Sequence, residues 1–189
     1  MKKIKIVCAF PLCGKTWAFR HQTELNFGRI ADSDSVNYHW LHEKTVDGKE
    51  IVTRNPDFPR NYINNALELI DDGYDVVFLS THEAVLAELN ERGIDYYIVF
   101  PCREMRYEWL RRAHMREFNV FDPDLLFNER NFDYMIDSMR HFTSAHTDRQ
   151  YVIASSGLYL PDVLTFFGFD SGQNVVKEPK KKDNGGLLV

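Results

Sequence analysis

Hydrophobic runs alternate with segments of helical periodicity along most of the chain. The runs that predict strands lie at residues 4–10, 27–31, 76–79, 96–100 and 151–154. Apolar residues at helical spacing predict helices over about 15–22, 60–72, 80–93, 103–116, 122–142 and 160–167. Strands that alternate with helices are typical of a parallel sheet with right-handed crossovers. We therefore predict an α/β protein with three layers, α/β/α, around a five-stranded parallel sheet.

The segment 36–60 interrupts this alternation, because it has no clear periodicity. Turn or breaker signals occur within it at Asp47-Gly48, Asn55-Pro56 and Phe58-Pro59. A long loop in a compact domain is typically functional or disordered, and the aromatic residues of this segment argue against disorder. We predict that this segment is an insertion that faces the substrate. Further on, the sequence from Ser80 to Glu83 has the form of a capping box, which predicts Ser80 as a helix cap.

Composition is that of one globular domain. The 189 residues, 44% of them hydrophobic, are enough for a single α/β core, which we place at 1–170 with a flexible tail at 171–189. No apolar run approaches the roughly 18 residues that span a bilayer, so we expect no membrane partner and a cytoplasmic location. The three cysteines have no metal-type spacing, and the net charge of −5 argues against broad nonspecific nucleic-acid binding.

A phosphate-binding loop is predicted at residues 9–16, between the first strand and the first helix. The residues expected to line the phosphates are Ala9, Pro11, Leu12, Cys13, Gly14, Lys15 and Thr16. In such a loop the backbone N–H groups surround a polyphosphate, Lys15 contacts the β- and γ-phosphates and Thr16 ligates Mg²⁺. ATP and Mg²⁺ are the expected cofactors. The alternative is an ordinary strand-to-helix turn that carries a lysine.

Two aspartates follow the second predicted strand. Asp32 and Asp34 are two residues apart, so in extended geometry their side chains share a face and could converge on one site. We assign Asp32 to the metal and Asp34 to the acceptor, whose hydroxyl proton it would accept, although the two roles could be exchanged. The alternative is that both residues only cap a helix or belong to a loop.

Arginines cluster after the fourth predicted strand, at positions 103, 106, 111, 112 and 116. Planar guanidinium groups suit phosphate oxygens, so the region 103–120 is predicted to form a lid over the phosphates. Arg103 and Arg106 share one side of the predicted helix, and we assign these two to catalysis. The alternative is a solvated helix face with interspersed glutamates.

The insertion supplies candidates for binding the acceptor. Arg54 and Arg60 bracket a short loop and could hold an anionic acceptor such as a nucleoside monophosphate. Tyr38 and Trp40 could stack on its base, although an aromatic residue in such a segment is as often part of the core.

These motifs together resemble a small P-loop kinase of the nucleoside-monophosphate-kinase-like group. Pro11 within the loop is similar to the proline of those kinases, and Asp32-Ser33-Asp34 resembles the paired aspartates of shikimate kinase and related hydroxyl kinases. The stretch 54–63 is similar to one in small nucleotide-kinase-like proteins of bacteriophages and their hosts. The resemblance implies a P-loop kinase fold with an acceptor region at 36–60 and an arginine-bearing lid. Leu12 stands where many of these kinases have Gly, and the third strand lacks a terminal acidic residue.

The leading prediction is an ATP-dependent kinase that moves the γ-phosphate to a nucleotide or nucleoside-like acceptor. A second prediction is a kinase of polynucleotide ends or of a hydroxymethylated base in phage-type DNA, which the acidic net charge does not favour. The alternative of another class is an ATP-binding regulatory module without phosphoryl transfer. The protein is expected in the cytoplasm, of the host if it is encoded by a phage, and its oligomeric state is not predicted.

Overall fold

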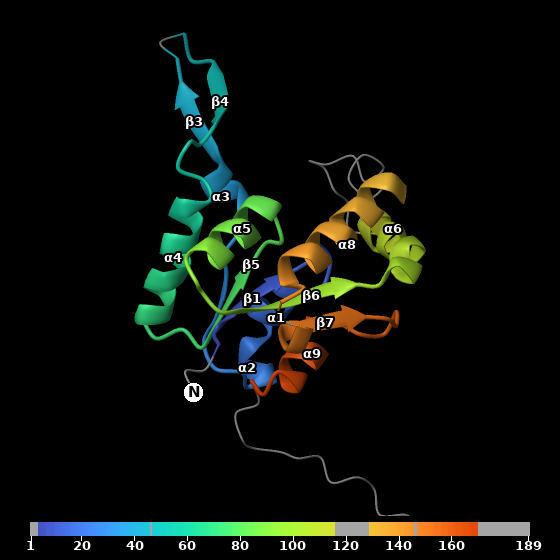
Figure 1. Ribbon diagram of the computed structural model, residues 1–189. Coiled ribbons are helices and arrows are strands. Elements are labelled where there is room, and N and C mark those ends of the chain that lie inside the picture. Colours follow the sequence, from blue (N-terminus) through green and yellow to red (C-terminus); the bar gives the residue numbers. More distant parts are fainter. Residues whose placement is uncertain (1–3, 46, 116–128, 146, 170–189) are drawn as a thin grey trace, which may run out of the picture.

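The computed structural model describes residues 4–45, 47–115, 129–145 and 147–169. Its centre is a five-stranded, all-parallel sheet in the order β2-β5-β1-β6-β7 (Figure 1). These strands are β1 (Ile6–Ala9), β2 (Ile30–Asp32), β5 (Val76–Leu79), β6 (Tyr96–Pro101) and β7 (Gln150–Ile153). The sheet confirms the predicted α/β class.

Helices flank the sheet on both faces (Figure 1). One group consists of α1 (Lys15–Arg20), α2 (Gln22–Leu25) and α9 (Leu160–Phe166). The other consists of α4 (Arg60–Asp71), α5 (Glu83–Glu91) and α8 (Glu129–Thr143), with α6 (Arg106–Met115) after a 3₁₀ turn at Arg103–Met105. Right-handed crossovers explain this division. The chain first moves from β1 to the edge strand β2, and it then moves across the sheet in the opposite direction, to β5, β6 and β7. The predicted helix start at 122, Arg116 and the predicted tail lie outside the described residues.

The central strands are buried on both faces. Every residue of β1 is at most 1% exposed, as is every residue of β5. This burial explains why both strands are continuous apolar runs rather than alternating ones. Phe10, directly after β1, packs edge-on against Trp109 and Phe132, with ring centroids 6.4 and 5.8 Å apart. The core therefore extends from the sheet to α6 and α8 at the end where β1 finishes.

The segment 36–60 is regular, which corrects the prediction of an aperiodic loop. It forms α3 (Val36–His39) and an antiparallel hairpin of β3 (Trp40–Lys44) and β4 (Glu50–Arg54). All residues of both strands are exposed, and the hairpin projects away from the rest of the molecule (Figure 1). Because neither face is buried, the strands lack the alternation that would have identified them. The turn signal at Asp47-Gly48 fits a hairpin.

Two predicted boundaries are wrong. β2 begins at Ile30 rather than at residue 27, because the left-handed backbone of Gly28, with φ +84°, is not extended. A Cβ at position 28 would lie 2.2 Å from a carboxylate oxygen of Asp75, so this turn requires glycine. The N-cap of α5 is His82, so Ser80 does not cap this helix.

Tyr62 joins the carboxyl ends of β2 and β5. Its side chain comes from α4 and is fully buried, and burial raises the pKa of its hydroxyl. The hydroxyl donates to the carbonyl oxygen of Ser33 at 2.6 Å and accepts the N–H of Ser80 at 3.1 Å. One phenol group therefore satisfies two backbone groups that the sheet leaves unpaired, and it fixes the spacing between the two strand ends.

We expect Tyr62→Phe to lower the free energy of unfolding by about 1–3 kcal/mol, because the N–H of Ser80 and the carbonyl of Ser33 lose a buried partner. Urea denaturation followed by circular dichroism measures the change. Tyr97→Phe is the matched control, since the half-buried Tyr97 ring stacks on Phe167 and the structure records no hydrogen bond of its hydroxyl among the described residues. Equal losses in the two variants would contradict the proposed link.

Candidate functional site

The site lies where neighbouring strand connections diverge. The chain leaves β1 toward β2 on one side, and it leaves β6 toward β7 on the other, although β1 and β6 are adjacent. In open α/β sheets, ligands bind outside the carboxyl ends of strands at such a switch point. The predicted phosphate loop follows β1 at this place, and the N–H of Phe10 donates to the carbonyl of Val99 at 2.9 Å.

Residues distant in sequence donate hydrogen bonds to the carbonyl groups of the loop. The indole Nε1 of Trp109 donates to the carbonyl of Pro11 at 2.9 Å. The N–H of Leu160, the first residue of α9, donates to the carbonyl of Cys13 at 2.8 Å. The carbonyl of Phe10 accepts the N–H of Cys13 at 3.3 Å, which closes the turn. Helices α6 and α9 therefore fix the orientation of the loop.

The N–H groups of the same loop are differently placed. Within the described part of the chain, the structure records no acceptor for the N–H groups of Leu12, Gly14 and Thr16. Leu12 and Gly14 have left-handed backbones, with φ +67° and +104°. Left-handed residues alternating with right-handed ones form concave arrays of N–H groups that bind anions. The loop therefore combines hydrogen-bonded carbonyls, at Ala9, Phe10, Pro11 and Cys13, with N–H groups that can donate to the oxygens of a phosphate.

Leu12 adopts the conformation that favours Gly at its position. A left-handed backbone costs a non-glycine residue roughly 1–2 kcal/mol. The Leu12 side chain is half-buried and packs against the hydrophobic core, which offsets part of this cost. The departure of this sequence from the usual glycine is therefore compatible with the loop geometry.

Lys15 lies within the loop. Its Nζ donates to the carbonyl of Ala9 at 2.6 Å, which places the charge beside the end of β1. Cys13 is fully buried, and burial raises the pKa of its thiol to about 12, although the charge of Lys15 opposes this shift. Cys13 is therefore a neutral packing residue of the turn. Thr16, the predicted magnesium ligand, lines the hollow beside the loop.

That hollow has a volume of about 450 Å³. Its lining includes Gly14, Thr16, Trp17, Arg112 and Tyr159. Together with Arg20, His21 and Arg111, which also line it, the walls combine aromatic rings with three guanidinium groups directly beside the phosphate loop. The indole of Trp17 is 51% exposed and stacks on His21, with ring centroids 4.1 Å apart.

Arg112 is the buried cation of this hollow. Its guanidinium lies over the rings of Trp109 and Tyr159, at 4.3 and 4.2 Å from their centroids. Its Nε donates to Glu108 at 2.9 Å and its Nη2 to the carbonyl of Ser156 at 2.8 Å. Its Nη1 has no partner among the described residues. Hydrogen bonds from Arg111 and Arg112 lower the pKa of the Glu108 carboxyl to about 2, so this carboxylate keeps its charge and orients Arg112.

The two arginines chosen from the sequence lie elsewhere. Arg103 forms an ion pair with Asp137, and Arg106 forms one with Asp133 at 3.6 Å, both on α8. Neither Arg103 nor Arg106 is among the residues that line the hollow beside the loop. Their part in catalysis stays a prediction. The spacing that brings Arg112 beside Trp109 was visible in the sequence, but its contact with Tyr159 was not.

A second hollow, of about 390 Å³, opens between the base of the hairpin and α5 and α8. Its lining includes His39, Arg54, Phe58 and His82. The ring of His39 stacks on Phe58 at 4.4 Å between centroids and meets His82 edge-on at 5.8 Å. This hollow therefore presents aromatic rings, one guanidinium and the carboxylate of Glu83 at the end of β5.

Charged groups of the second hollow and of the phosphate loop both affect the pKa of His82. Burial lowers the pKa of His82, and the charges of His39, Lys15 and Arg54 lower it further, while Asp34 raises it. Burial and then Arg54 lower the pKa of His39. Both rings are therefore neutral near pH 7, and the basic groups around them supply the positive charge of the site.

The predicted acidic pair occupies two different settings. Asp32 is the last residue of β2 and is half-buried, beside the strand end that Tyr62 fixes. Asp34 lies beyond the strand and accepts the N–H of Val36 at 3.0 Å on one carboxylate oxygen. The bond of Asp34 is that of a turn before α3, whereas Asp32 belongs to the strand itself, and the convergence of the two carboxylates stays a prediction.

The four residues predicted to bind the acceptor also lie in different surroundings. Arg54 lines the second hollow. Tyr38 packs against the buried Tyr62 at 5.2 Å, so it belongs to the core edge, and Trp40 is 41% exposed at the base of the hairpin. Arg60 turns away to Glu88 on α5, with a side chain that is 75% exposed. His39 and Phe58 were not assigned from the sequence, because only the folded hairpin brings them together.

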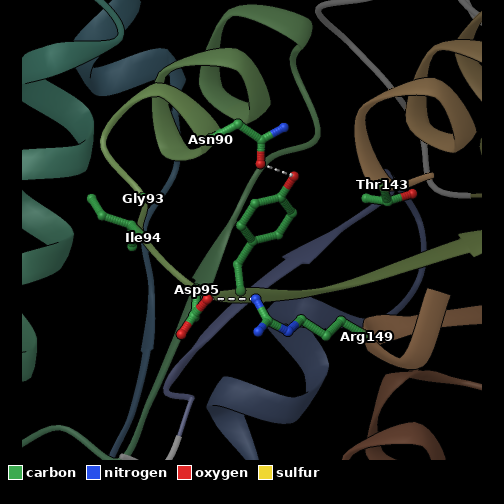
Figure 2. A pocket seen from close by; sticks show the side chains of 7 residues that line it. Asn90, Gly93, Ile94, Asp95, Thr143 and Arg149 are labelled. Atoms are coloured by element: carbon green, nitrogen blue, oxygen red, sulfur yellow. Dashed lines mark hydrogen bonds and ion pairs between the residues drawn. The ribbon is translucent and has the colours of Figure 1, made fainter. Parts of the chain in front are cut away.

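A third hollow, at the opposite end of β6, does not fit a substrate. Figure 2 shows Arg149 extending to Asp95, to which it is bonded at 2.5 Å. The hollow measures about 80 Å³. Ligand pockets typically have about 300 Å³ or more. The space in Figure 2 is therefore a gap beside a surface ion pair.

Neither protein-family models nor curated protein sequences gave a match to this chain. No helix in the described ranges has the length and apolar character needed to cross a membrane. In the same ranges, no group of three or more His, Cys, Asp or Glu side chains could hold a metal ion.

We expect the free energy of unfolding to fall as the pH drops below the ordinary histidine pKa of 6.5. The pKa of His82 and that of His39 are lower in the folded state, so the unfolded chain binds more protons in this range and gains stability. Denaturation curves at several pH values between 5 and 7.5 measure the slope. His82→Gln removes one of the two groups and should flatten the slope, and His39→Gln with it should flatten it more. An unchanged slope in the double variant would refute this assignment.

Proposed function

We propose that the protein is an ATP-dependent phosphotransferase of the P-loop kinase type, which moves the γ-phosphate of ATP to a nucleotide or nucleoside-like acceptor. The loop between β1 and α1 carries this proposal. Its carbonyls are bound by Trp109 and Leu160, while the N–H groups of Leu12, Gly14 and Thr16 have no recorded acceptor among the described residues. An array of this polarity favours a phosphate over a cation.

The hollow beside the loop suits the donor nucleotide. Its volume of about 450 Å³ lies within the range of small-molecule sites. Trp17 and Tyr159 offer faces for a base. Arg112, whose Nη1 has no partner within the described part of the chain, offers a donor to an anionic oxygen. Lys15 would then move from the carbonyl of Ala9 to the terminal phosphates, over which it spreads positive charge.

In this proposal Thr16, in the first turn of α1, and Asp32, at the end of β2, would hold a magnesium ion. In phosphotransferase sites, Mg²⁺ is held by one or two protein oxygens together with water and phosphate oxygens. The hydroxyl of Thr16 and the half-buried carboxylate of Asp32 are oxygen ligands of this kind. The ion would neutralise charge on the phosphates, while the protein itself orients them through the loop.

The second hollow suits the acceptor. Arg54 would hold an anionic group, and the stacked rings of His39 and Phe58 would contact a base. Asp34, which is close enough to His82 to raise its pKa, would accept the proton of the attacking hydroxyl. In this proposal residues 36–60 form the acceptor region. The lid would be the predicted region 103–120, of which residues 116–120 lie outside the described ranges, and Arg103 and Arg106 would reach the phosphates after exchanging their partners on α8.

We expect Lys15→Ala to reduce ATP-dependent phosphoryl transfer by at least about 100-fold, because it removes charge that stabilises the transition state. Transfer is measured with γ-labelled ATP, and ATP binding by calorimetry. Arg92→Ala is the charge-matched control, since Arg92 bonds Asn64 at the far end of α5. Unchanged binding and turnover in Lys15→Ala would remove the basis of the proposal.

The acceptor is tested with labelled ATP against nucleosides, nucleoside monophosphates, small sugars and oligonucleotides. We expect label in a nucleotide or nucleoside, and Asp34→Asn should lower kcat by about 100-fold or more with little change in the KM for ATP. Label that enters only DNA would identify a nucleic-acid kinase instead. ATP binding without transfer to any acceptor, unaltered by Asp34→Asn, would identify a regulatory module.

A further inference from the structure

The projecting hairpin has two free edges. In its ladder, the N–H of Thr45 donates to the carbonyl of Lys49, and the N–H of Asn55 donates to that of His39, both at 2.8 Å. Hydrogen-bonded pairs alternate along an antiparallel ladder. The backbone groups of Ile51 and Thr53 therefore face β3, and those of Glu50, Val52 and Arg54 face outward.

By this alternation, the N–H and carbonyl groups of Val52 face away from β3, and no third strand pairs with β4 among the described residues. The side chains add to this exposure, since Ile51 is 45% and Val52 is 49% exposed. A two-stranded ribbon is marginally stable in water by itself, and an unpaired edge with β-branched residues favours another strand. The hairpin is therefore suited to pairing with a further strand.

We propose that β4 pairs with β4 of a second copy of the chain, antiparallel and centred on Val52. This arrangement places Val52 opposite Val52 and Glu50 opposite Arg54 of the second copy. The pairing makes hydrogen-bonded pairs of the three outward-facing residues. At both ends it also places Glu50, whose carboxylate bonds His42 of its own hairpin at 2.8 Å, opposite the basic Arg54. It yields a continuous four-stranded antiparallel sheet around a two-fold axis, in which residue i contacts j and j contacts i.

The other edge of the hairpin is less suited to the same contact. A β3 pair centred on His42 would place two imidazoles opposite each other, with Trp40 opposite Lys44. It would lack both the central β-branched pair and the opposite charges. A nucleic acid is also a poor occupant, because the acidic and basic residues of β3, β4 and the described part of their turn balance. The charge pattern of β4 therefore selects a second copy of this chain.

The interface is small, because each copy contributes one five-residue strand. Small interfaces are typical of weak and reversible association. We expect a monomer–dimer equilibrium in the micromolar range, on the order of 10 μM, visible by sedimentation velocity. A protein that stays monomeric up to about 500 μM would overturn the proposal.

Proline substitution tests which edge pairs. Val52→Pro removes an outward N–H without removing a β3–β4 bond, so it should abolish the dimer and keep the hairpin. Lys44→Pro removes an outward N–H on the opposite edge and keeps the bond between His42 and Glu50, so it is the matched control and should leave the dimer intact. Loss of the dimer in Lys44→Pro alone would place the contact on β3 and overturn the proposal.

Charge exchange and cross-linking provide two independent tests. Glu50→Arg or Arg54→Glu alone should raise the dissociation constant by roughly tenfold, and the two together should largely restore it. In a Cys102→Ser background, Val52→Cys should form a disulfide-linked dimer on oxidation, whereas His42→Cys should not. A double exchange weaker than both single variants, or a cross-link only at position 42, would contradict β4 pairing.

Discussion

The need to satisfy buried carbonyl groups determines the shape of the site. The loop after β1 can direct its N–H groups outward only because its carbonyls find donors behind it. Those donors, Trp109 and Leu160, are far from the loop in sequence and close to it in the fold. Helices α6 and α9 therefore shape the loop as much as its own residues do. Packing of Leu12 against the core offsets part of the free-energy cost of its left-handed backbone.

The same framework separates two regions of different chemistry. Beside the loop, Arg112 is held between two aromatic rings and keeps one nitrogen without a recorded partner in the described part of the protein. At the hairpin base, His39 and His82 stay neutral. Arg54 carries the positive charge there, together with Lys15 of the phosphate loop. Tyr62 fixes the distance between the ends of β2 and β5, and so the position of Asp32 relative to His82. The proposed donor and acceptor regions thus share rigid elements.

The sequence predicted those features that depend on neighbouring residues. The strands of the sheet were found because each contains a short apolar run, fully buried in β1 and β5 and only partly buried in β7, and the loop because its residues are contiguous. The hairpin was missed because exposed strands show no alternation. Arg112, Tyr159, His39 and Phe58 were not assigned because tertiary packing, and no spacing in the chain, brings them together. Arg103 and Arg106 were chosen by helical angle, which does not reveal the acidic residues that α8 presents to them.

The three tryptophans of the chain are distributed over three different parts of this architecture. Trp17 stands half-exposed at the rim of one hollow, Trp109 is buried behind the loop, and Trp40 is at the root of the hairpin. Indole emission responds to the polarity around the ring, so the three report separately on events at these places. The protein consequently contains its own optical probes, and replacing two indoles at a time would isolate each signal without attaching a dye.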